Sequence, residues 1–331
     1  MKLLTRFLFI AFLGLHLSGQ VLGQDNRASL QDNLKEATEQ EKAQAIILLR
    51  SGGKWEVNLV GRTSGGTLKM RRAGQTGIYE YPLKDIAAIK FNLEVDEVEM
   101  SALFNARKFK DVVKAIDEPT RDVMRYMDIP NNANKLIMQM LRALFWDKQY
   151  EEAIKTCENI MRPLRTAKGP DFVEAELMKI LSLQAMGKAD LTVRMLDKME
   201  PIHRKDPLAT MWLHSMTTMH LSTNNWKQAA EYNAQLIAYG SKDFEWMPAG
   251  LYRSMEYYDG NTNYPVALQI TEEIDIVAQN SQWALKAFDA KPKIEKRNTA
   301  YEAQLEAEKA AAAAERAKDP GKIHKTPTLL D

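Results

Sequence analysis

Residues 145–154 read Phe-Trp-Asp-Lys-Gln-Tyr-Glu-Glu-Ala-Ile, and this stretch decides the fold. Tyr150 follows a short polar turn, and the small residue Ala153 stands three positions later. Similar segments recur along the chain, beginning at Phe109, Ala189, Trp226 and Tyr264. The five starting points are 41, 39, 37 and 38 residues apart. A period in this range predicts an array of helix pairs, because each pair buries its apolar face by stacking on the next.

The first and fourth positions of each segment have a predicted packing role. We expect the aromatic residue to fill the gap between two hairpins, and the small residue to let the helices approach to about 8–10 Å. Tyr150 and Trp226 are therefore predicted core residues. Prolines are expected between the helices, where they would act as breakers; they are Pro119, Pro130, Pro163, Pro170, Pro201 and Pro207.

This pattern resembles the tetratricopeptide repeat, in which a Gly-x-Tyr-x-x-Ala turn joins two helices. The best match is residues 145–154, followed by residues 224–230, Asn-Asn-Trp-Lys-Gln-Ala-Ala. The third unit keeps Gly187 but has Ala189 and Thr192 at the aromatic and small positions. The resemblance covers roughly residues 96–279. It implies a mostly α protein, an α-solenoid of about five helical hairpins that binds an unidentified protein or peptide in its concave groove.

A turn-rich segment precedes the predicted array, since seven of the 16 glycines lie within residues 51–77. Alternating apolar residues, such as Trp55, Val57 and Leu59, indicate half-buried strands. Five short strands are expected, at residues 45–49, 55–59, 67–71, 78–81 and 86–91. Strands this short can curl into one small antiparallel β-barrel, and the order of turns is similar to that of SH3-like and Sm-like barrels.

The remaining segments complete the predicted organisation. Residues 24–44 are polar and are expected to form a lead helix or linker. Residues 93–280 would form the helical array, and the carboxylates of residues 94–99 would lie in the first turn of a helix, where its dipole favours them. Residues 281–318 are predicted to be a C-terminal helix whose first part caps the array and whose charged remainder is exposed. Residues 319–331 are expected to be disordered.

The N-terminus has the pattern of a secretory signal peptide over residues 1–23. Lys2 and Arg6 precede an apolar run from Phe7 to Leu17, and Gly23 precedes the expected cleavage point. The run is too short to span a membrane, which needs about 20 residues. The single cysteine forms no internal disulfide, and there is no Asn-x-Ser/Thr sequon. We therefore expect a periplasmic protein, with release outside the cell as the alternative.

Composition excludes several classes of function. The 331 residues include 45 Lys and Arg against 44 Asp and Glu, a balance that argues against a dedicated nucleic-acid binder. One cysteine excludes multi-cysteine metal sites. His214 and His220 are six residues apart on a predicted helix, so they face different sides and cannot share a metal. The sequence has no P-loop and no hydrolase or metalloprotease motif. We expect no cofactor, no metal and no enzymatic activity.

The resemblance also places the binding groove. In tetratricopeptide-like arrays the concave wall consists of first-helix residues that do not pack on the second helix. The corresponding positions here are Met138, Arg142, Trp146, His214, Thr218, Tyr252 and Glu256. They combine a flexible Met, aromatic anchors and an Arg able to hold a carboxylate. The alternative is that Met138, Trp146 and Tyr252 belong to the core between hairpins.

The β segment offers a second candidate surface. Residues 45–91 carry eight basic side chains against the acidic Glu56, Glu80 and Asp85, a balance of +5. Local positive potential concentrates anions, so an anionic glycan or a lipid headgroup is the alternative ligand. The residues expected to hold it are Arg50, Lys54, Arg62, Lys69, Arg71 and Arg72. An ordinary solvated face would have the same composition.

Overall fold

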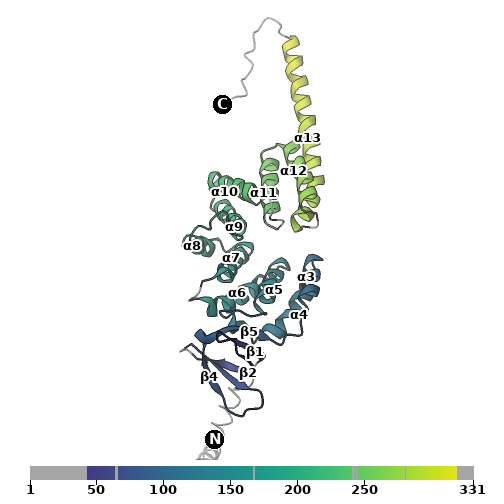
Figure 1. Cartoon of the computed structure of the whole chain (residues 1–331). Helices are drawn as coiled ribbons and strands as arrows, with labels where there is room; N and C mark the ends of the chain where they lie inside the picture. The colour runs from purple at the N-terminus through teal and green to yellow at the C-terminus, as the bar shows by residue number, and fades with distance from the viewer. Residues whose placement is uncertain are drawn as a thin grey trace, which may run out of the picture. The chain divides into compact units, whose positions relative to one another are not determined.

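The structure is a computed structural model that describes residues 43–318, apart from residues 64, 65, 167, 241, 242, 244 and 280. The predicted signal peptide, nearly all of the lead segment and the predicted disordered tail lie outside the described residues. The chain divides into two compact units, residues 1–178 and 179–331. The boundary lies within helix α7 (Pro170–Ala185), and Figure 1 shows the elements of both units.

The first unit begins with a five-stranded antiparallel sheet. Its spatial order is β4-β3-β2-β1-β5. The strands are β1 (Ala43–Leu49), β2 (Lys54–Arg62), β3 (Thr67–Arg72), β4 (Tyr79–Pro82) and β5 (Ile86–Phe91), with a 3₁₀ turn, η1 (Leu83–Asp85), before the last. Alternate side chains form a core, as the sequence predicts: Ile47, Leu59, Leu68, Met70, Ile86 and Ile89 are at most 2% exposed.

The predicted closed barrel is wrong, because the sheet is open and β4 and β5 are its two edges. A loop from the helical part occupies the β5 edge instead of a strand. The Ile89 N–H donates to the Pro130 carbonyl over 2.9 Å. The Asn132 carboxamide accepts from the Phe91 N–H over 2.8 Å and donates to the Phe91 carbonyl over 3.0 Å. These bonds satisfy the backbone groups that would otherwise pair with another strand.

Four α-helices of the first unit precede α7 and form two hairpins. They are α3 (Glu97–Asn105), α4 (Phe109–Thr120), α5 (Asn134–Trp146) and α6 (Tyr150–Leu164), with a 3₁₀ turn, η2 (Met124–Tyr126), between the pairs. Asp96 caps α3, since its carboxylate accepts from the Val98 and Glu99 N–H groups over 2.7 and 3.2 Å. Pro119 and Pro163 lie in the last turns of α4 and α6 rather than between helices.

The second unit continues with helices to the end of the described chain. They are α8 (Ala189–Leu196), α9 (Ala209–Ser222), α10 (Trp226–Tyr239), α11 (Met247–Gly260), α12 (Tyr264–Val277) and α13 (Gln282–Lys318). The first part of α13 joins the core of α11 and α12 through Trp283, Ala287 and Ile294. Beyond Ile294, most described side chains of α13 are exposed. The helices α3 to α12 thus form five consecutive hairpins, and the predicted helical hairpin array is confirmed.

The repeat register is also confirmed at the small-residue position. The second helix of each hairpin starts at the residue that opens each sequence segment, from Phe109 in α4 to Tyr264 in α12. Three positions later the side chain is at most 2% exposed in all five hairpins, at Val112, Ala153, Thr192, Ala229 and Ala267. The aromatic position varies more. Tyr264 is 8% exposed, but Trp226, a predicted core residue, is 59% exposed.

The turn inside each hairpin has one residue in the left-handed backbone region. It stands two positions before the second helix in every hairpin, at Arg107, Lys148, Gly187, Asn224 and Thr262, with φ between 58° and 72°. Only Gly187 adopts this conformation without steric cost. Asn tolerates it better than most residues, whereas a β-branched residue such as Thr262 is strained there.

We predict that Thr262→Gly stabilises the second unit, because the exposed Thr262 side chain is lost at little cost while the backbone strain is relieved. The left-handed penalty is about 1–2 kcal/mol, part of which is offset by the greater entropy of glycine in the unfolded chain. A net gain of about 1 kcal/mol raises the Tm by about 2–4 °C. Thermal melts followed by circular dichroism measure this shift.

Gly187→Ala should lower the Tm, since the added Cβ meets no neighbour and only the backbone is strained. Asn224→Gly is the matched control and should change the Tm less than Thr262→Gly does. Equal shifts for Asn224→Gly and Thr262→Gly would contradict the strain argument.

Candidate functional site

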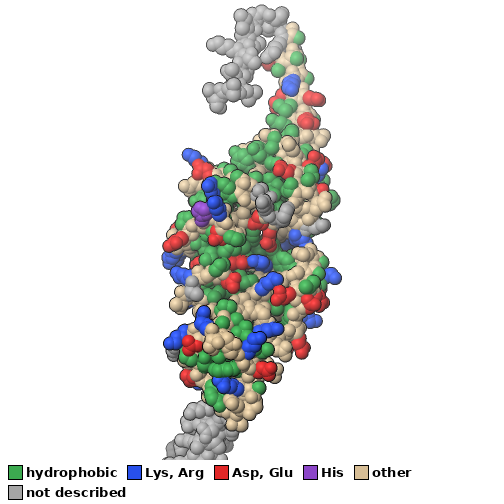
Figure 2. All heavy atoms as spheres, in the orientation of Figure 1, with side chains coloured by type: hydrophobic (Ala, Val, Ile, Leu, Met, Phe, Trp, Pro, Cys, Tyr) green, Lys and Arg blue, Asp and Glu red, His purple; other side chains and the backbone are tan. Residues whose placement is uncertain are grey.

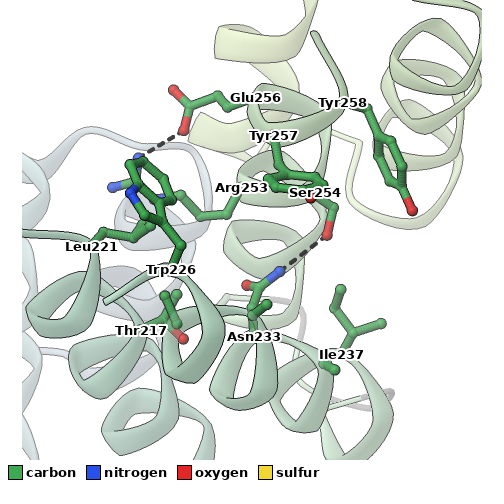
Figure 3. Close-up of a pocket in the computed structure, with 13 residues that line it drawn as sticks. Thr217, Leu221, Trp226, Asn233, Ile237, Arg253, Ser254, Glu256, Tyr257 and Tyr258 are labelled. Atoms are coloured by element: carbon green, nitrogen blue, oxygen red, sulfur yellow. Dashed lines mark hydrogen bonds and ion pairs between the residues drawn. The ribbon is translucent and has the colours of Figure 1, made fainter. Parts of the chain in front are cut away.

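The second unit contains a cavity of about 530 Å³ between α9, α10 and α11. Thr217 and Leu221 from α9 line one side. Figure 3 shows the side chains of α10 and α11 that complete it, among them Trp226, Asn233, Ile237, Arg253, Glu256, Tyr257 and Tyr258. We call this cavity the α9–α11 groove. Its volume is in the range of sites that bind drug-sized ligands.

Two exposed aromatic side chains line the groove. Trp226, the first residue of α10, is 59% exposed, and Tyr257 of α11 is 55% exposed. Five of the other eleven lining residues are aliphatic, among them Leu221, Ala229 and Ile237. Large aromatic rings left in water beside an apolar cavity are typical of interaction sites.

Most of the polar groups of the groove come from α10 and α11. The Asn233 Nδ2 donates to the Gly250 carbonyl over 3.1 Å and to the Ser254 Oγ over 3.0 Å. Arg253 Nη1 donates to Glu256 Oε2 over 2.7 Å. Asn233 Oδ1 and Arg253 Nε are buried and have no hydrogen-bond partner among residues 43–318 as described. The groove therefore contains one unused acceptor and one unused donor.

The predicted groove residues of the first unit lie in or against its core. Met138 is 5% exposed, so it lies in the core, which is the alternative given for it above. Arg142 Nε donates to Glu174 Oε1 over 2.5 Å, which engages the guanidinium predicted to hold a partner's carboxylate. Trp146 is half-buried, and its ring centroid lies 4.7 Å from that of Phe145.

In the second unit, Glu256 is the one predicted residue that lines the α9–α11 groove. His214 is 6% exposed and lies 5.2 Å from the Trp246 ring, so it is a core residue and its predicted binding role is wrong. Tyr252 is half-buried, 5.6 Å from the Trp283 ring. Thr218 donates its hydroxyl hydrogen to the His214 carbonyl over 3.0 Å. Its neighbour Thr217, together with Leu221 one turn later, faces the groove instead.

Trp226, Asn233, Arg253 and Tyr257 were not predicted as groove residues. Only first-helix positions were predicted to line the groove, whereas Trp226 and Asn233 belong to the second helix α10. One signal was available in the pair Tyr257 and Tyr258. Consecutive residues on a helix are about 100° apart, so two adjacent aromatic side chains cannot both point into one core.

At least three of the six predicted basic residues are engaged within the first unit. Arg62 forms two bonds with the Asp128 carboxylate, of 2.7 and 2.9 Å. Arg50 Nε donates to the Lys84 carbonyl over 2.9 Å, and the Arg72 guanidinium lies 3.6 Å from the Trp55 ring centroid. Lys54 is exposed, while Lys69 and Arg71 are half-buried. On the face shown in Figure 2, basic and acidic side chains are interspersed, with no extended region of one sign.

Within the described ranges, no group of three or more His, Cys, Asp and Glu residues is placed to hold a metal ion. No described helix is both long enough and apolar enough to cross a bilayer. Cys157 is fully buried in α6.

We predict that His214 makes stability depend on pH. Burial, together with repulsion from Arg253 and Lys286, lowers the pKa of His214 from 6.5 to about 3. Between these values the unfolded chain binds a proton that the folded chain does not, so stability falls as the pH is lowered below about 6.5. The loss attributable to His214 at pH 5 is about 2 kcal/mol.

Thermal melts from pH 7 to pH 5 test this, with His214→Phe and the exposed control His203→Phe. His214→Phe should flatten the decline in Tm, whereas His203→Phe should leave it unchanged. An equal decline in wild type and His214→Phe would assign the acid sensitivity to other groups.

Part of the chain is similar to solved structures of helical repeat proteins. No protein-family model matches the chain, and no curated protein matches it. Two solved structures from Podosopora anserina, nearly identical TPR-like repeats of a protein described as a kinesin light chain, are similar to 54% of this chain. One is 14% identical, with 93% of that chain covered and a TM-score of 0.35. The other, a variant of the same protein, is 13% identical, with 92% covered and a TM-score of 0.37. The helical hairpin array itself is established by the register and burial of the helices described above.

Proposed function

We propose that the protein is a non-enzymatic scaffold for protein–protein interaction, and that its α9–α11 groove binds a peptide segment of a partner. The observation that carries this proposal is the pair of exposed aromatic residues, Trp226 and Tyr257, lining an apolar cavity of about 530 Å³. Helical hairpin arrays commonly present such surfaces to partners.

The magnitude of the available apolar burial supports binding of moderate strength. Covering the exposed part of Trp226 (59%) or Tyr257 (55%) contributes roughly 1–2 kcal/mol by its buried area. Two such side chains, with the aliphatic lining, offset several kcal/mol of the entropy lost on association.

The chemistry of the lining favours binding over catalysis. The residues that line the groove include no His and no Cys, and their one carboxylate, Glu256, is held in an ion pair with Arg253. Nucleophilic or general-base catalysis needs a side chain that is activated and aimed at a reacting atom. The groove instead has an apolar body and a few polar groups, which is typical of recognition.

We further propose that this scaffold acts after export. The support is the basic N-terminus, with Lys2 and Arg6, and the apolar run from Phe7 to Leu17. Mass spectrometry of the mature protein should find an N-terminus at Gln24. A mature protein that begins at Met1 would contradict export with cleavage.

A peptide library tests the groove. We expect phage-displayed 12-residue peptides selected on the full chain to carry an aromatic or branched aliphatic anchor. Trp226→Ala and Tyr257→Ala should each weaken binding of the selected peptide about tenfold, measured by fluorescence anisotropy, because each removes about 1.4 kcal/mol of burial. The Tm should stay within a few degrees, because both side chains are already exposed.

Phe288→Ala is the matched control, since Phe288 lies on α13 and is 77% exposed but does not line the groove. It should leave the affinity unchanged. Full affinity in the Trp226→Ala, Tyr257→Ala double variant would place the binding surface elsewhere.

A further inference from the structure

The α9–α11 groove contains a carboxamide at a position that the other hairpins fill differently. Asn233 is seven residues after the start of α10. The same position in the other four second helices is occupied by Ile116, Cys157, Leu196 and Thr271. All five side chains are at most 9% exposed. A packing role alone would be served by an apolar residue such as Leu196, so the carboxamide of Asn233 requires a separate explanation.

The orientation of this carboxamide is fixed by its neighbours. The Gly250 carbonyl can only accept a hydrogen bond, so the Asn233 Nδ2 must face it, 3.1 Å away. The second Nδ2 hydrogen is directed at Ser254 Oγ, 3.0 Å away. Both donor hydrogens are thus used. The Oδ1 atom points away from Ser254, as Figure 3 shows, and has no partner in the described part of the chain.

A buried acceptor without a partner is costly, by about 1–3 kcal/mol. A ligand that supplies an N–H or O–H group recovers this energy when it binds. Oδ1 lies below the surface, so one of the side chains around it must change rotamer to admit the ligand. Trp226 is 59% exposed, and rotamer changes of exposed side chains are fast.

The second unused group identifies the kind of ligand. Arg253 Nε is a buried donor without a partner among the described residues, while Nη1 of the same guanidinium is held by Glu256. A complementary ligand therefore has a hydrogen-bond donor for Asn233 Oδ1, a hydrogen-bond acceptor for Arg253 Nε, and apolar surface between them. A carboxylate has no donor for Asn233, and an ammonium group has no acceptor for Arg253. A peptide backbone has both groups at every residue except proline.

We infer that Asn233 accepts a hydrogen bond from a backbone N–H of the bound peptide, next to an apolar anchor residue, and that Arg253 Nε donates to a carbonyl of the same segment. This inference rests on the proposed function and specifies its ligand. The partner segment is extended, because its N–H and C=O groups must be unused by a helix of its own. It carries an aromatic or aliphatic side chain toward Trp226 and Tyr257, and it has no proline at the residue that donates to Asn233.

The test uses the selected peptide and the full chain. Each backbone N–H of the peptide is replaced in turn by N-methyl, and the dissociation constant is measured by isothermal titration calorimetry. At one position beside the anchor, N-methylation should weaken binding to the wild type by about tenfold, which corresponds to one lost hydrogen bond and one acceptor left unpaired. At solvent-facing positions the change should be less than about twofold.

An N-methyl group could weaken binding either by removing the hydrogen bond to Asn233 Oδ1 or by clashing with the groove. The variant Asn233→Leu separates these two causes. Leu stands at the equivalent position in α8, so this variant should fold, with a Tm within a few degrees of the wild type. In Asn233→Leu the sensitive N-methyl position should lose its effect, falling to about twofold or less. Ser254→Ala is the matched control, because it removes one partner of Nδ2 but leaves Oδ1 in place; it should retain the tenfold effect.

The outcomes distinguish the inference from the function on which it rests. If Trp226→Ala abolishes binding but every N-methyl effect is the same in wild type and Asn233→Leu, the groove binds peptide and the role of Asn233 is overturned. If the selected peptide binds Trp226→Ala and Tyr257→Ala as tightly as it binds the wild type, the proposed function fails and the inference fails with it. The N-methyl series on the wild type also tests the inference without a variant, because the inference is overturned if no position beside the anchor weakens binding by more than about twofold.

Discussion

Close contact between paired helices at one small or β-branched residue is the constraint on which the array depends. Val112, Ala153, Thr192, Ala229 and Ala267 are at most 2% exposed, so no longer side chain fits at these positions. The contact also requires a sharp turn before each second helix. The chain provides that turn with a left-handed residue at the same place in all five hairpins, although only Gly187 takes this conformation freely. The helix contact is thus maintained at some cost in backbone strain.

The sheet stays open because a loop from the helical part pairs with its β5 edge. In a closed barrel the free edge of β5 would pair with β4. Here the loop that leads into α5 forms hydrogen bonds with that edge instead. Asn132 bonds to both backbone groups of Phe91, and Pro130 accepts from Ile89. Arg62 on β2 adds a two-bond ion pair with Asp128 of the same segment. Side chains 40 or more residues away in the sequence therefore decide whether the sheet closes.

Local patterns predicted the elements well but not the groove. Alternation gave the five strands, and the 37–41-residue spacing gave the five hairpins with the correct first residue of each second helix. The closed barrel could not be excluded from residues 45–91 alone, because its edge partner is the distant Asn132. Met138 and His214 were assigned to the surface by analogy with a concave wall, yet both are core. Helical spacing gives the relative direction of side chains, but which face is covered depends on the neighbouring hairpin.

A comparison of equivalent positions in the repeats explains why the groove occurs beside Trp226. Phe109 and Tyr150 each have an aromatic residue five positions earlier, Phe104 and Phe145, whose rings lie 5.2 and 5.8 Å away. Tyr264 is covered by Tyr301 of α13 at 5.7 Å. Before Trp226 the same position holds the smaller Leu221, and no ring contact to Trp226 occurs among the described residues. The hairpin α9–α10 therefore keeps the aromatic residue of the repeat but lacks the aromatic partner that covers it elsewhere. The cavity beside Trp226 follows from that missing ring, and Asn233 supplies an unused polar acceptor where the other repeats have Ile116, Cys157, Leu196 and Thr271.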